Sequence, residues 1–461
     1  MSNVLVLGVG PLPVDPSEKL YAPGLRTWHF AESIAKKRHN VMLGLIDFGD
    51  FSDNVKSYAG PQREEAGEFL TILRLKYHRK QTSEALRTLH IGCKFNCVVS
   101  TTDIMNGIAA SLPFHLPLWL DYNGEPFAEK QLQAMVHNND AALYDQWKLL
   151  FQGLLAGDRF STASEAQKYA LIGQLGFAGR LNARTSGERL VHKILPCSRA
   201  MAGNISGFPV AVKARLIPAD CFMILWSGGY NSWCDPEVLF HGIEIAMRRN
   251  PRIYFISTGG EIGGHDTETF SRFQKLVEES DIAHRFHFSG WVPTEQMPSY
   301  YRQADVAINV DSFSYECELG HRNRIVDWML YQTPVLTTEL CEFTRTLSAN
   351  ELVYTFPIGD AEAMAGELLR IASDPEAAKG RAKRAKRFLD TEYDEMKVLT
   401  PLLNWVAAPE FSGDRTEQGL APSSLAALHG DLLKRHASGM LHHGKPSLLK
   451  RVLSKVTGTR A

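Results

Sequence analysis

The chain contains no long hydrophobic run, although 44% of its 461 residues are hydrophobic. No stretch approaches the roughly 18 apolar residues of a membrane-spanning helix, so we expect no such span. The first residues, MSNVLVLG, lack the basic n-region and the cleavage site of a secretion signal, and we expect a cytoplasmic protein. Seven cysteines without a CxxC pair favour buried thiols over a disulfide framework or a zinc site.

The chain also lacks an excess of charge of either sign. Fifty Lys and Arg residues against 51 Asp and Glu residues give a net charge of -1, so we expect no nucleic-acid partner. The P-loop motif GxxxxGK[ST], the dinucleotide motif GxGxxG and any Asp-x-Asp pair are missing too. These absences exclude a P-loop enzyme and disfavour an NAD enzyme, and we expect neither a metal nor another cofactor.

The chain does contain a regular alternation of apolar strands and amphipathic helices. Continuous apolar runs such as Val4–Val9 are typical of parallel strands that are covered on both faces, and the alternation restarts near Phe222. This pattern predicts an α/β protein with two doubly wound, Rossmann-like domains. We expect an N-terminal domain over 1–210, a second domain over 220–392, a helix over 393–408 that returns toward the first domain, and a flexible tail over 410–461.

Glycines end the first predicted strand of each domain. Gly8 and Gly10 follow that strand in the first domain, and Gly228 and Gly229 follow it in the second. Ligands of doubly wound sheets bind beyond the carboxyl ends of the strands, and glycine lets a ligand approach the backbone. Each pair is a candidate ligand site, with a tight turn as the alternative.

The loop after the predicted strand Pro117–Leu120 carries three polar side chains, Asp121, Asn123 and Glu125. We expect them to face the cleft, where they would bind substrate hydroxyls or act as a base. An ordinary polar turn is the alternative. One long helical stretch is expected after this loop, ending near Leu155.

Two arginines stand where a helix is predicted to begin. Arg322 and Arg324 are unfavourable at a helix N-terminus, which already carries a partial positive charge. Their position makes sense if a polyphosphate binds there, since helix N-termini bind anions through free N–H groups. Asp327, one turn further along, would then accept hydrogen bonds from ribose hydroxyls. A solvated charged turn is the alternative.

The segment Tyr315–Asp327 and the Pro334-Val335 pair after it resemble a known donor-site signature. It is that of retaining GT-B glycosyltransferases of the glycosyltransferase family 4 type. That signature has two acids eight residues apart with a Gly between them, then a small-Gly-x-Pro-Val stretch. Pro334 and Val335 set the register and put Asp327 at the second acid.

The match departs from the signature at two positions. Leu319 falls at the first acid with Glu318 beside it, and Gln332 replaces the usual Gly. A family-4-like subgroup with Arg-x-Arg-x-x-Asp before this strand fits Arg322–Asp327 better. The resemblance extends to the stretches RFHFSGWVP and YYRQADVAINV and covers most of 220–395. The first domain matches mainly in its order of elements and in Gly24.

The resemblance implies a GT-B fold, with two Rossmann-like domains facing a cleft, and a glycosyltransferase of polysaccharide biosynthesis. Such an enzyme moves a sugar, with retention, from a nucleotide-diphosphate donor to a saccharide or lipid-linked acceptor. Neutralising the leaving phosphate is its main catalytic task. The implied residues are Arg322, Arg324 and Glu318 for catalysis, Gly228, Gly229, Trp291, Val292, Gly320, His321, Asn323 and Asp327 for the donor, and Gly10, Gly24, Asp121, Asn123 and Glu125 on the acceptor side.

One departure supports a rival function. The family usually places Arg and Lys just after the first strand of the second domain, but the stretch Gly228–Asp235 carries no cation. Either Arg322 and Arg324 neutralise the diphosphate, or the protein is a catalytically inactive GT-B paralogue that acts as a binding partner in glycan assembly. A nucleotide-sugar epimerase, which shares the architecture, is a third alternative, and the Pro334 region argues against it.

The C-terminal end is basic and amphipathic. From Met440 onward the chain has no acidic residue. Its five basic residues are Lys445, Lys450, Arg451, Lys455 and Arg460, and the apolar residues that would share a helical face are Leu448, Leu449, Val452, Leu453 and Val456. Such a helix can lie on an anionic bilayer, which predicts a peripheral membrane contact at the inner face. A disordered solubilising tail is the alternative.

Overall fold

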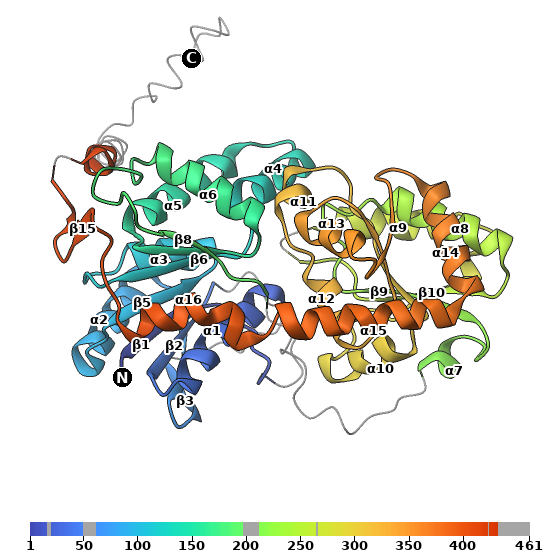
Figure 1. The fold of residues 1–461 in the computed structure, drawn as a ribbon, viewed down its shortest axis with the longest axis horizontal. Helices are drawn as coiled ribbons and strands as arrows, with labels where there is room; N and C mark the ends of the chain where they lie inside the picture. The colour runs from blue at the N-terminus through green and yellow to red at the C-terminus, as the bar shows by residue number, and fades with distance from the viewer. Residues whose placement is uncertain (16–19, 49–60, 197–211, 264–265, 423, 432–461) are drawn as a thin grey trace, which may run out of the picture.

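The computed structural model describes residues 1–15, 20–48, 61–196, 212–263, 266–422 and 424–431. Two largely parallel β-sheets, each with helices on its faces, lie side by side (Figure 1). This arrangement confirms the expected α/β class with two Rossmann-like domains. Within the described ranges, no helix combines the length and the apolarity that crossing a bilayer requires.

The first sheet holds its strands in the order β3-β4-β2-β1-β5-β6-β7-β8. All neighbours are parallel except β3 and β4. The strands are β1 (Asn3–Gly8), β2 (Asn40–Asp47), β3 (Gln62–Gly67), β4 (Leu70–Lys76), β5 (Cys97–Thr101), β6 (Leu118–Tyr122), β7 (Arg159–Thr162) and β8 (Val191–Lys193). The helices are α1 (Ala22–Lys36), α2 (Arg79–Cys93), α3 (Asp103–Ala110), α4 (Pro126–His137), α5 (Ala141–Ala156) and α6 (Glu165–Phe177).

The second sheet is parallel throughout, in the order β11-β10-β9-β12-β13-β14. Its strands are β9 (Phe222–Ser227), β10 (Ile253–Thr258), β11 (Phe286–Phe288), β12 (Val306–Asn309), β13 (Val335–Thr338) and β14 (Tyr354–Phe356). Its helices are α7 (Val212–Leu216), α8 (Pro236–Arg249), α9 (Glu268–Glu278), α10 (Met297–Gln303), α11 (Tyr315–Leu319), α12 (Asn323–Leu330), α13 (Glu342–Ala349) and α14 (Ala361–Ser373), with 3₁₀ turns at Ala283–Arg285 and Thr294–Gln296.

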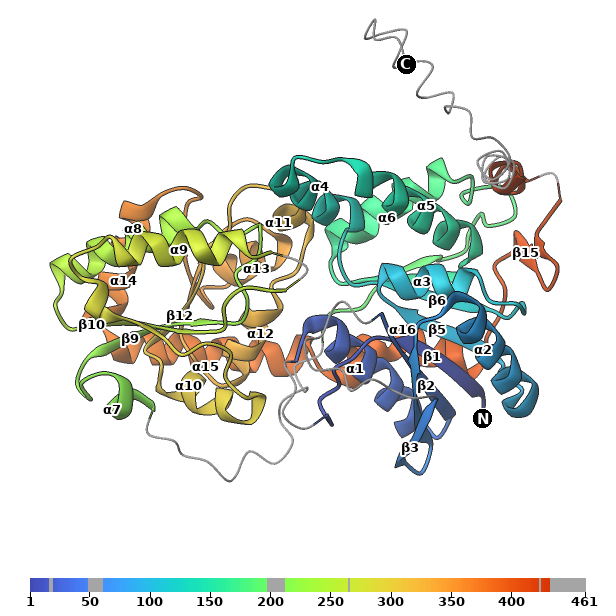
Figure 2. The same ribbon diagram turned by 180° about the vertical axis from the view of Figure 1, so that it is seen from behind.

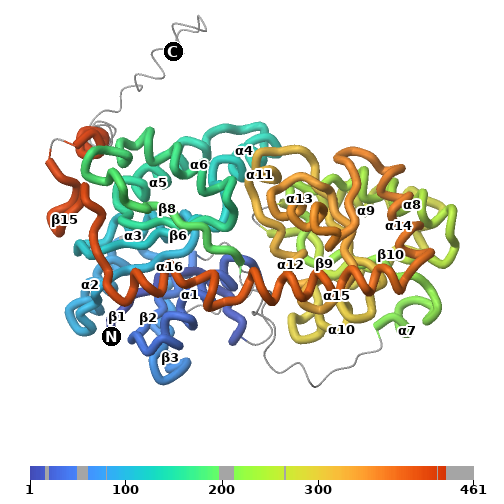
Figure 3. Tube along the Cα trace, in the orientation of Figure 1, coloured from blue at the N-terminus to red at the C-terminus, as the bar shows by residue number. Residues whose placement is uncertain are grey.

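Two C-terminal helices run along both domains. Figures 1 and 3 show α15 (Pro375–Glu392) beside the second sheet and α16 (Glu395–Ala407) continuing beside the first. Helix α15 packs on α12, and α16 packs on α1, which Figure 2 shows from behind. The Ser33 hydroxyl of α1 donates to the Glu395 carboxylate of α16, and the apolar face of α16, including Leu399 and Leu402, is buried. The chain therefore returns to the first domain after completing the second.

Some elements escape the sequence pattern. The hairpin β3–β4 and helices α2, α11 and α13 have no counterpart in the predicted alternation, nor has the short strand β14. The single long helix expected up to Leu155 is two helices, because Asn138 adopts a left-handed conformation with φ 47° and ends α4. An asparagine at such a helix end tolerates positive φ at low cost.

The flexible tail predicted from residue 410 is wrong for its first part. Asp414 forms an ion pair of 2.8 Å with Arg180, and both side chains are fully buried. Arg415 forms a second one of 3.0 Å with Asp158. Strands β15 (Arg415–Thr416) and β16 (Gly419–Leu420) follow. Paired buried charges thus hold this segment on the first domain, and the basic amphipathic end over 440–461 lies outside the described residues.

Candidate functional site

Three glycine-bearing loops meet at the carboxyl edge of the second sheet. Gly228 follows β9, Gly259 follows β10 and Gly290 follows β11. The Gly228 amide donates to Thr258 O at 2.7 Å, and the Gly259 amide donates to Gly290 O at 2.7 Å. Gly259 has φ 127°, and a Cβ atom there would lie 2.2 Å from Gly228 O. Only glycine fits such an approach, so these loops form one tightly packed backbone surface.

Arg324 lies beside this glycine surface, in the first turn of α12. Its guanidinium stacks over the Trp226 ring at 4.5 Å, and its Nη2 donates to Gly229 O at 2.9 Å. Its Nη1 is buried and makes no hydrogen bond within the described part of the chain. Buried donors without a partner are rare in folded proteins, and they indicate a position where a ligand can bind.

Arg322, in contrast, is fully engaged. Its Nε donates to the Asp311 carboxylate at 2.8 Å, its two terminal nitrogens reach Glu316 at 3.3 and 3.2 Å, and its side chain is 4% exposed. A Cβ atom at Gly320 would lie 2.5 Å from Glu316 O and 2.9 Å from Arg322 Nη1, so this glycine makes room for both the backbone of α11 and the guanidinium. The charge that Arg322 was expected to bring to a diphosphate is therefore already neutralised.

His321 and Asn323 contact each other rather than the glycine loops. The His321 ring stacks on Phe343 at 4.2 Å, and its Nε2 lies 3.0 Å from the Tyr393 hydroxyl. Burial is the main cause that lowers the pKa of His321 to about 3, so the ring is neutral. Its Nδ1 lies 3.2 Å from Asn323 Oδ1. The position of His321 is that of a packing residue.

Glu318 and Asp327 lie at opposite ends of the predicted signature. Glu318, in α11, is 42% exposed and lies 4.0 Å from Arg345 Nη2. Asp327 is half-buried, and burial raises the pKa of its carboxyl to about 7. Burial and Asp327 together raise the pKa of Tyr331, the C-cap of the same helix, to about 12. The energetic cost of an ionised Asp327 would fall if hydroxyl donors reached it.

Trp291 lies at the boundary between the domains. Its ring meets Tyr21 of the first domain edge-on at 5.9 Å, and its Nε1 donates to Glu261 O at 3.3 Å. Val292, the next residue, packs on the core of the second domain. Trp291 therefore contacts the first domain, whereas Val292 packs within the second.

The expectation that Asp121 faces a cleft is wrong. This side chain is fully buried, and it receives two hydrogen bonds from Arg26, at 2.9 and 2.7 Å, and one from Ser161 at 2.5 Å. Arg26 also donates to the carbonyls of Ile194 and Leu195. Asp121 holds α1 to the sheet, because a buried carboxylate needs such a set of donors.

Glu125 also has a local role. It is the N-cap of α4, where its carboxylate accepts from Ala128 N at 2.6 Å, and it accepts from Gln174 at 2.8 Å. Asn123 is half-buried in the same loop. In α1, Gly24 is required, because a Cβ atom there would lie 2.0 Å from Pro11 O, whereas a Cβ atom at Gly10 would meet only Leu12 N, at 3.9 Å.

Two features of the domain boundary were not foreseen from the sequence. Glu342, the first residue of α13, accepts from Glu165 N at 2.7 Å and from Ala166 N at 3.4 Å, so it caps α6 of the first domain. Lys193 lies 3.4 Å from the same carboxylate. The Ser164 hydroxyl caps α6 by accepting from Gln167 N, and it also donates to Leu319 O at 2.6 Å.

Glu129 is the second feature. Burial is the main cause that raises the pKa of this α4 carboxyl to about 7, and the nearby acids Asp103 and Glu316 add to it. Glu316 belongs to the second domain, so Glu129 lies within electrostatic reach of the pair formed by Glu316 and Arg322. The sequence offers no signal for this, since Glu129 stands among ordinary polar residues of a helix. Over the described ranges, no group of three His, Cys, Asp or Glu side chains is arranged to hold a metal ion.

The comparisons with known proteins concern the second domain and the overall fold. Residues 223–374 match the family model described as glycosyl transferases group 1. A search of curated protein sequences found no significant match. Among solved structures, the sucrose-phosphate synthase of Thermosynechococcus elongatus is 18% identical, with a TM-score of 0.69 over 89% of this chain and 100% of that one.

Two other solved structures are similar over comparable lengths. HepE of Anabaena, solved in complex with UDP and glucose, is 13% identical, with a TM-score of 0.57 over 88% of this chain and 100% of that one. An α,α-trehalose-phosphate synthase (UDP-forming) of Burkholderia vietnamiensis is 13% identical, with a TM-score of 0.60 over 89% and 100%. The chain therefore has the GT-B fold, and its second half carries a glycosyl transferases group 1 domain.

Proposed function

We propose that this chain is a retaining glycosyltransferase. It moves a sugar from a nucleotide-diphosphate donor, bound by the second domain, to a saccharide or lipid-linked acceptor at the first. Polysaccharide biosynthesis in the cytoplasm is the proposed setting. The group 1 domain over 223–374 supports the donor class, and the GT-B fold of the whole chain supports an acceptor between two domains.

Arg324 carries the proposal. Its buried Nη1 has no acceptor in the described part of the chain, and its other contacts aim it along the Gly228–Gly229 loop. An unpaired buried donor costs about 1–3 kcal/mol, and a phosphate oxygen would remove this cost through a charge-assisted hydrogen bond. Because negative charge builds on the leaving diphosphate as the sugar departs, a fixed cation there stabilises the transition state more than the ground state.

The other donor-side residues take supporting roles. Arg322 is a positioning residue that holds Glu316 and Asp311, rather than a diphosphate ligand. Asp327 accepts from the ribose hydroxyls, and hydroxyl donors would offset the burial that raises its pKa to about 7. Glu318 lies nearest the transferred sugar.

On the acceptor side we assign binding to Asn123 and Glu129 in place of Asp121 and Glu125. The latter two are occupied by Arg26 and by the α4 cap. A Cβ atom at Gly10, after β1, would make only an ordinary contact, with Leu12 N at 3.9 Å. Glu129 has a pKa raised to about 7, so near neutral pH it is present in both protonation states and can exchange hydrogen bonds with hydroxyls as donor or acceptor.

The test is a panel of nucleotide sugars, begun with UDP-sugars because HepE was solved with UDP and glucose. Slow hydrolysis without an acceptor, measured as release of nucleoside diphosphate, is expected for one donor. Arg324→Ala should abolish it, and Arg272→Ala, which removes an exposed arginine paired with Glu237, is the matched control. If neither the wild type nor the control variant releases nucleoside diphosphate from any donor, the proposed enzymatic activity is wrong.

The inactive paralogue remains the second candidate because of Arg322. Arg322 is already paired with the carboxylates of Asp311 and Glu316. Of the two arginines in the predicted Arg-x-Arg motif, Arg324 is therefore the one with a nitrogen that has no acceptor in the described part of the chain. A chain that binds a nucleoside diphosphate, with thermal stabilisation abolished by Arg324→Ala, but releases none from any nucleotide sugar would be this binding protein.

A further inference from the structure

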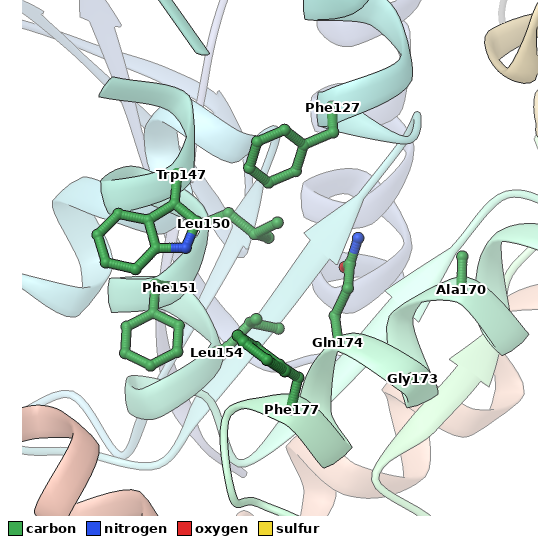
Figure 4. A pocket seen from close by; sticks show the side chains of 9 residues that line it. All are labelled: Phe127, Trp147, Leu150, Phe151, Leu154, Ala170, Gly173, Gln174 and Phe177. Carbon is green, nitrogen blue, oxygen red and sulfur yellow. The ribbon is translucent and has the colours of Figure 1, made fainter. Parts of the chain in front are cut away.

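An apolar groove opens on the first domain, between α4, α5 and α6. It has a volume of about 360 Å³. Figure 4 shows aromatic side chains from all three helices around it, with two leucines between them. Its large apolar lining residues are Phe127, Trp147, Leu150, Phe151, Leu154 and Phe177.

The rim of the groove is unusually apolar for a protein surface. Phe177 is 77% exposed and Trp147 is 36% exposed. The wall formed by α6 is low, because it carries Ala170 and Gly173, and a Cβ atom at Gly173 would meet nothing within 4 Å. Contiguous exposed apolar side chains of this size mark interaction sites.

The described chain ends beside this groove. Residues 425–431 are helical, and the His429 ring lies 5.9 Å from the ring of Phe151, which lines the groove. A Cβ atom at Gly430 would lie 3.7 Å from the side chain of Leu155, which is in α5 like Phe151. Leu425 and Leu428 are 52% and 58% exposed, so apolar surface continues from the groove along this segment. Residues 432–461 therefore begin next to an uncovered apolar surface.

One stretch of those residues has the pattern that fits such a surface. Leu449, Val452, Leu453 and Val456 would share one face of a helix, and Lys450 and Arg451 would lie on the other. From residue 431 to 448 the chain can extend at most roughly 60 Å, and it starts close to the groove, since the His429 ring lies 5.9 Å from that of Phe151. A tether of this length gives an effective concentration in the millimolar range.

We propose that residues 444–457 form an amphipathic helix that covers this groove, with its apolar face against Trp147, Phe151 and Phe177. This is the helix-in-groove mode of recognition, here within one chain. The charged residues at the rim of the groove favour this helix over a lipid bilayer as the group that covers it. Asp145 lies 3.0 Å from Lys148 on α5, so this pair adds no net positive charge that would hold the face on an anionic membrane.

Hydrogen exchange on the full chain tests the proposal. In wild-type protein, amides of 444–457 should exchange about tenfold more slowly than in a chain whose groove is blocked. Gly173→Leu blocks it without a clash, since the added side chain enters open space. Gly380→Leu, on α15 where a Cβ atom also meets nothing within 4 Å, is the matched control and should exchange like wild type.

A second pair of variants works from the other partner. Leu449→Asp should speed exchange in 444–457 and raise binding of an apolar dye at the groove, while Ser454→Asp on the opposite helical face should change neither. Equal exchange in all four variants and wild type would overturn the proposal. So would slow exchange that arises only with phosphatidylglycerol vesicles and not with phosphatidylcholine vesicles or buffer, since the segment would then bind membranes instead.

Discussion

Arg26, in the second turn of α1, and Arg324, in the first turn of α12, both lie near the start of a helix, yet their surroundings differ. Arg26 is 3% exposed, and its donors reach both oxygens of Asp121 and two backbone carbonyls. Arg324 has one carbonyl, one aromatic face and a buried nitrogen without a partner in the described chain. A buried cation with all donors satisfied serves the fold, whereas an incompletely satisfied one is available to an anion.

The largest expected effect is on the fold, at Arg26. Arg26→Ala leaves the Asp121 carboxylate buried without its main partner, and breaking such a pair costs about 3–5 kcal/mol of unfolding free energy. The denaturation midpoint of the first domain in urea should fall accordingly. Arg324→Ala should lower the midpoint far less. Equal midpoints for the two variants would remove the distinction between these arginines.

The next effect is on turnover, at Arg324. Arg324→Ala should cost about 2–4 kcal/mol of transition-state stabilisation, roughly a 30- to 1,000-fold loss in kcat/KM, because a shielded charge-assisted contact to the diphosphate is lost. The measurement is steady-state turnover with the donor found in the panel, alongside circular dichroism. Full activity, or a loss that follows unfolding, would show that Arg324 only packs on Trp226.

Asp327 offers a smaller, pH-dependent effect. Its folded pKa of about 7 lies above the usual value of 3.8, so the folded protein is penalised when the carboxyl ionises. The penalty is absent below about pH 4, grows as the pH rises through 7 and is complete above it. Asp327→Asn should therefore raise the free energy of unfolding at pH 8 by on the order of 1 kcal/mol, seen as a higher thermal midpoint, and leave it unchanged at pH 4.

The contrary result is informative as well. A stability gain in Asp327→Asn that is the same at pH 4 and pH 8 would mean that burial does not control this carboxyl. In either case, affinity for a nucleoside diphosphate measured by calorimetry should fall in the variant if Asp327 binds ribose.

The smallest expected effect is that of a chelator. If Arg324 neutralises the diphosphate, turnover should persist in excess EDTA, since the chain has neither an Asp-x-Asp pair nor a Cys and His spacing suited to a metal. Loss of activity that magnesium restores would assign the neutralisation to a metal and reduce Arg324 to a secondary role.

Much of the fold can be predicted because parallel strands buried on both faces are continuous apolar runs. Val4 to Leu7 in β1 are all fully buried, and the run is visible in the sequence. Strand β3 escapes prediction for the opposite reason, since it lies at the sheet edge with all residues exposed. The packed segment after residue 410 escapes because its anchor, Arg180, is over 200 positions away in the sequence.

The site is harder to predict, because partners decide a charged residue's role. Arg322 and Arg324 look equivalent in the sequence, yet Asp311, two residues after β12, accepts from Arg322, whereas Arg324 donates to Gly229 O. Asp121 lies near the carboxyl end of β6, as a ligand-binding acid would, but Arg26, on a helix 95 positions earlier, already pairs with it. Spacing identifies the helix start correctly and says nothing about which side chain is already paired.

Because Glu342 of the second domain caps α6 of the first, hydrogen exchange at this cap would report any separation of the two domains. The amides of Glu165 and Ala166 belong to one domain, and their acceptor belongs to the other. Whenever the two halves swing apart, these amides lose their acceptor and face water. Their protection against solvent deuterium therefore reports the fraction of time the halves spend apart, without an attached label. A ligand that draws the halves together should increase that protection.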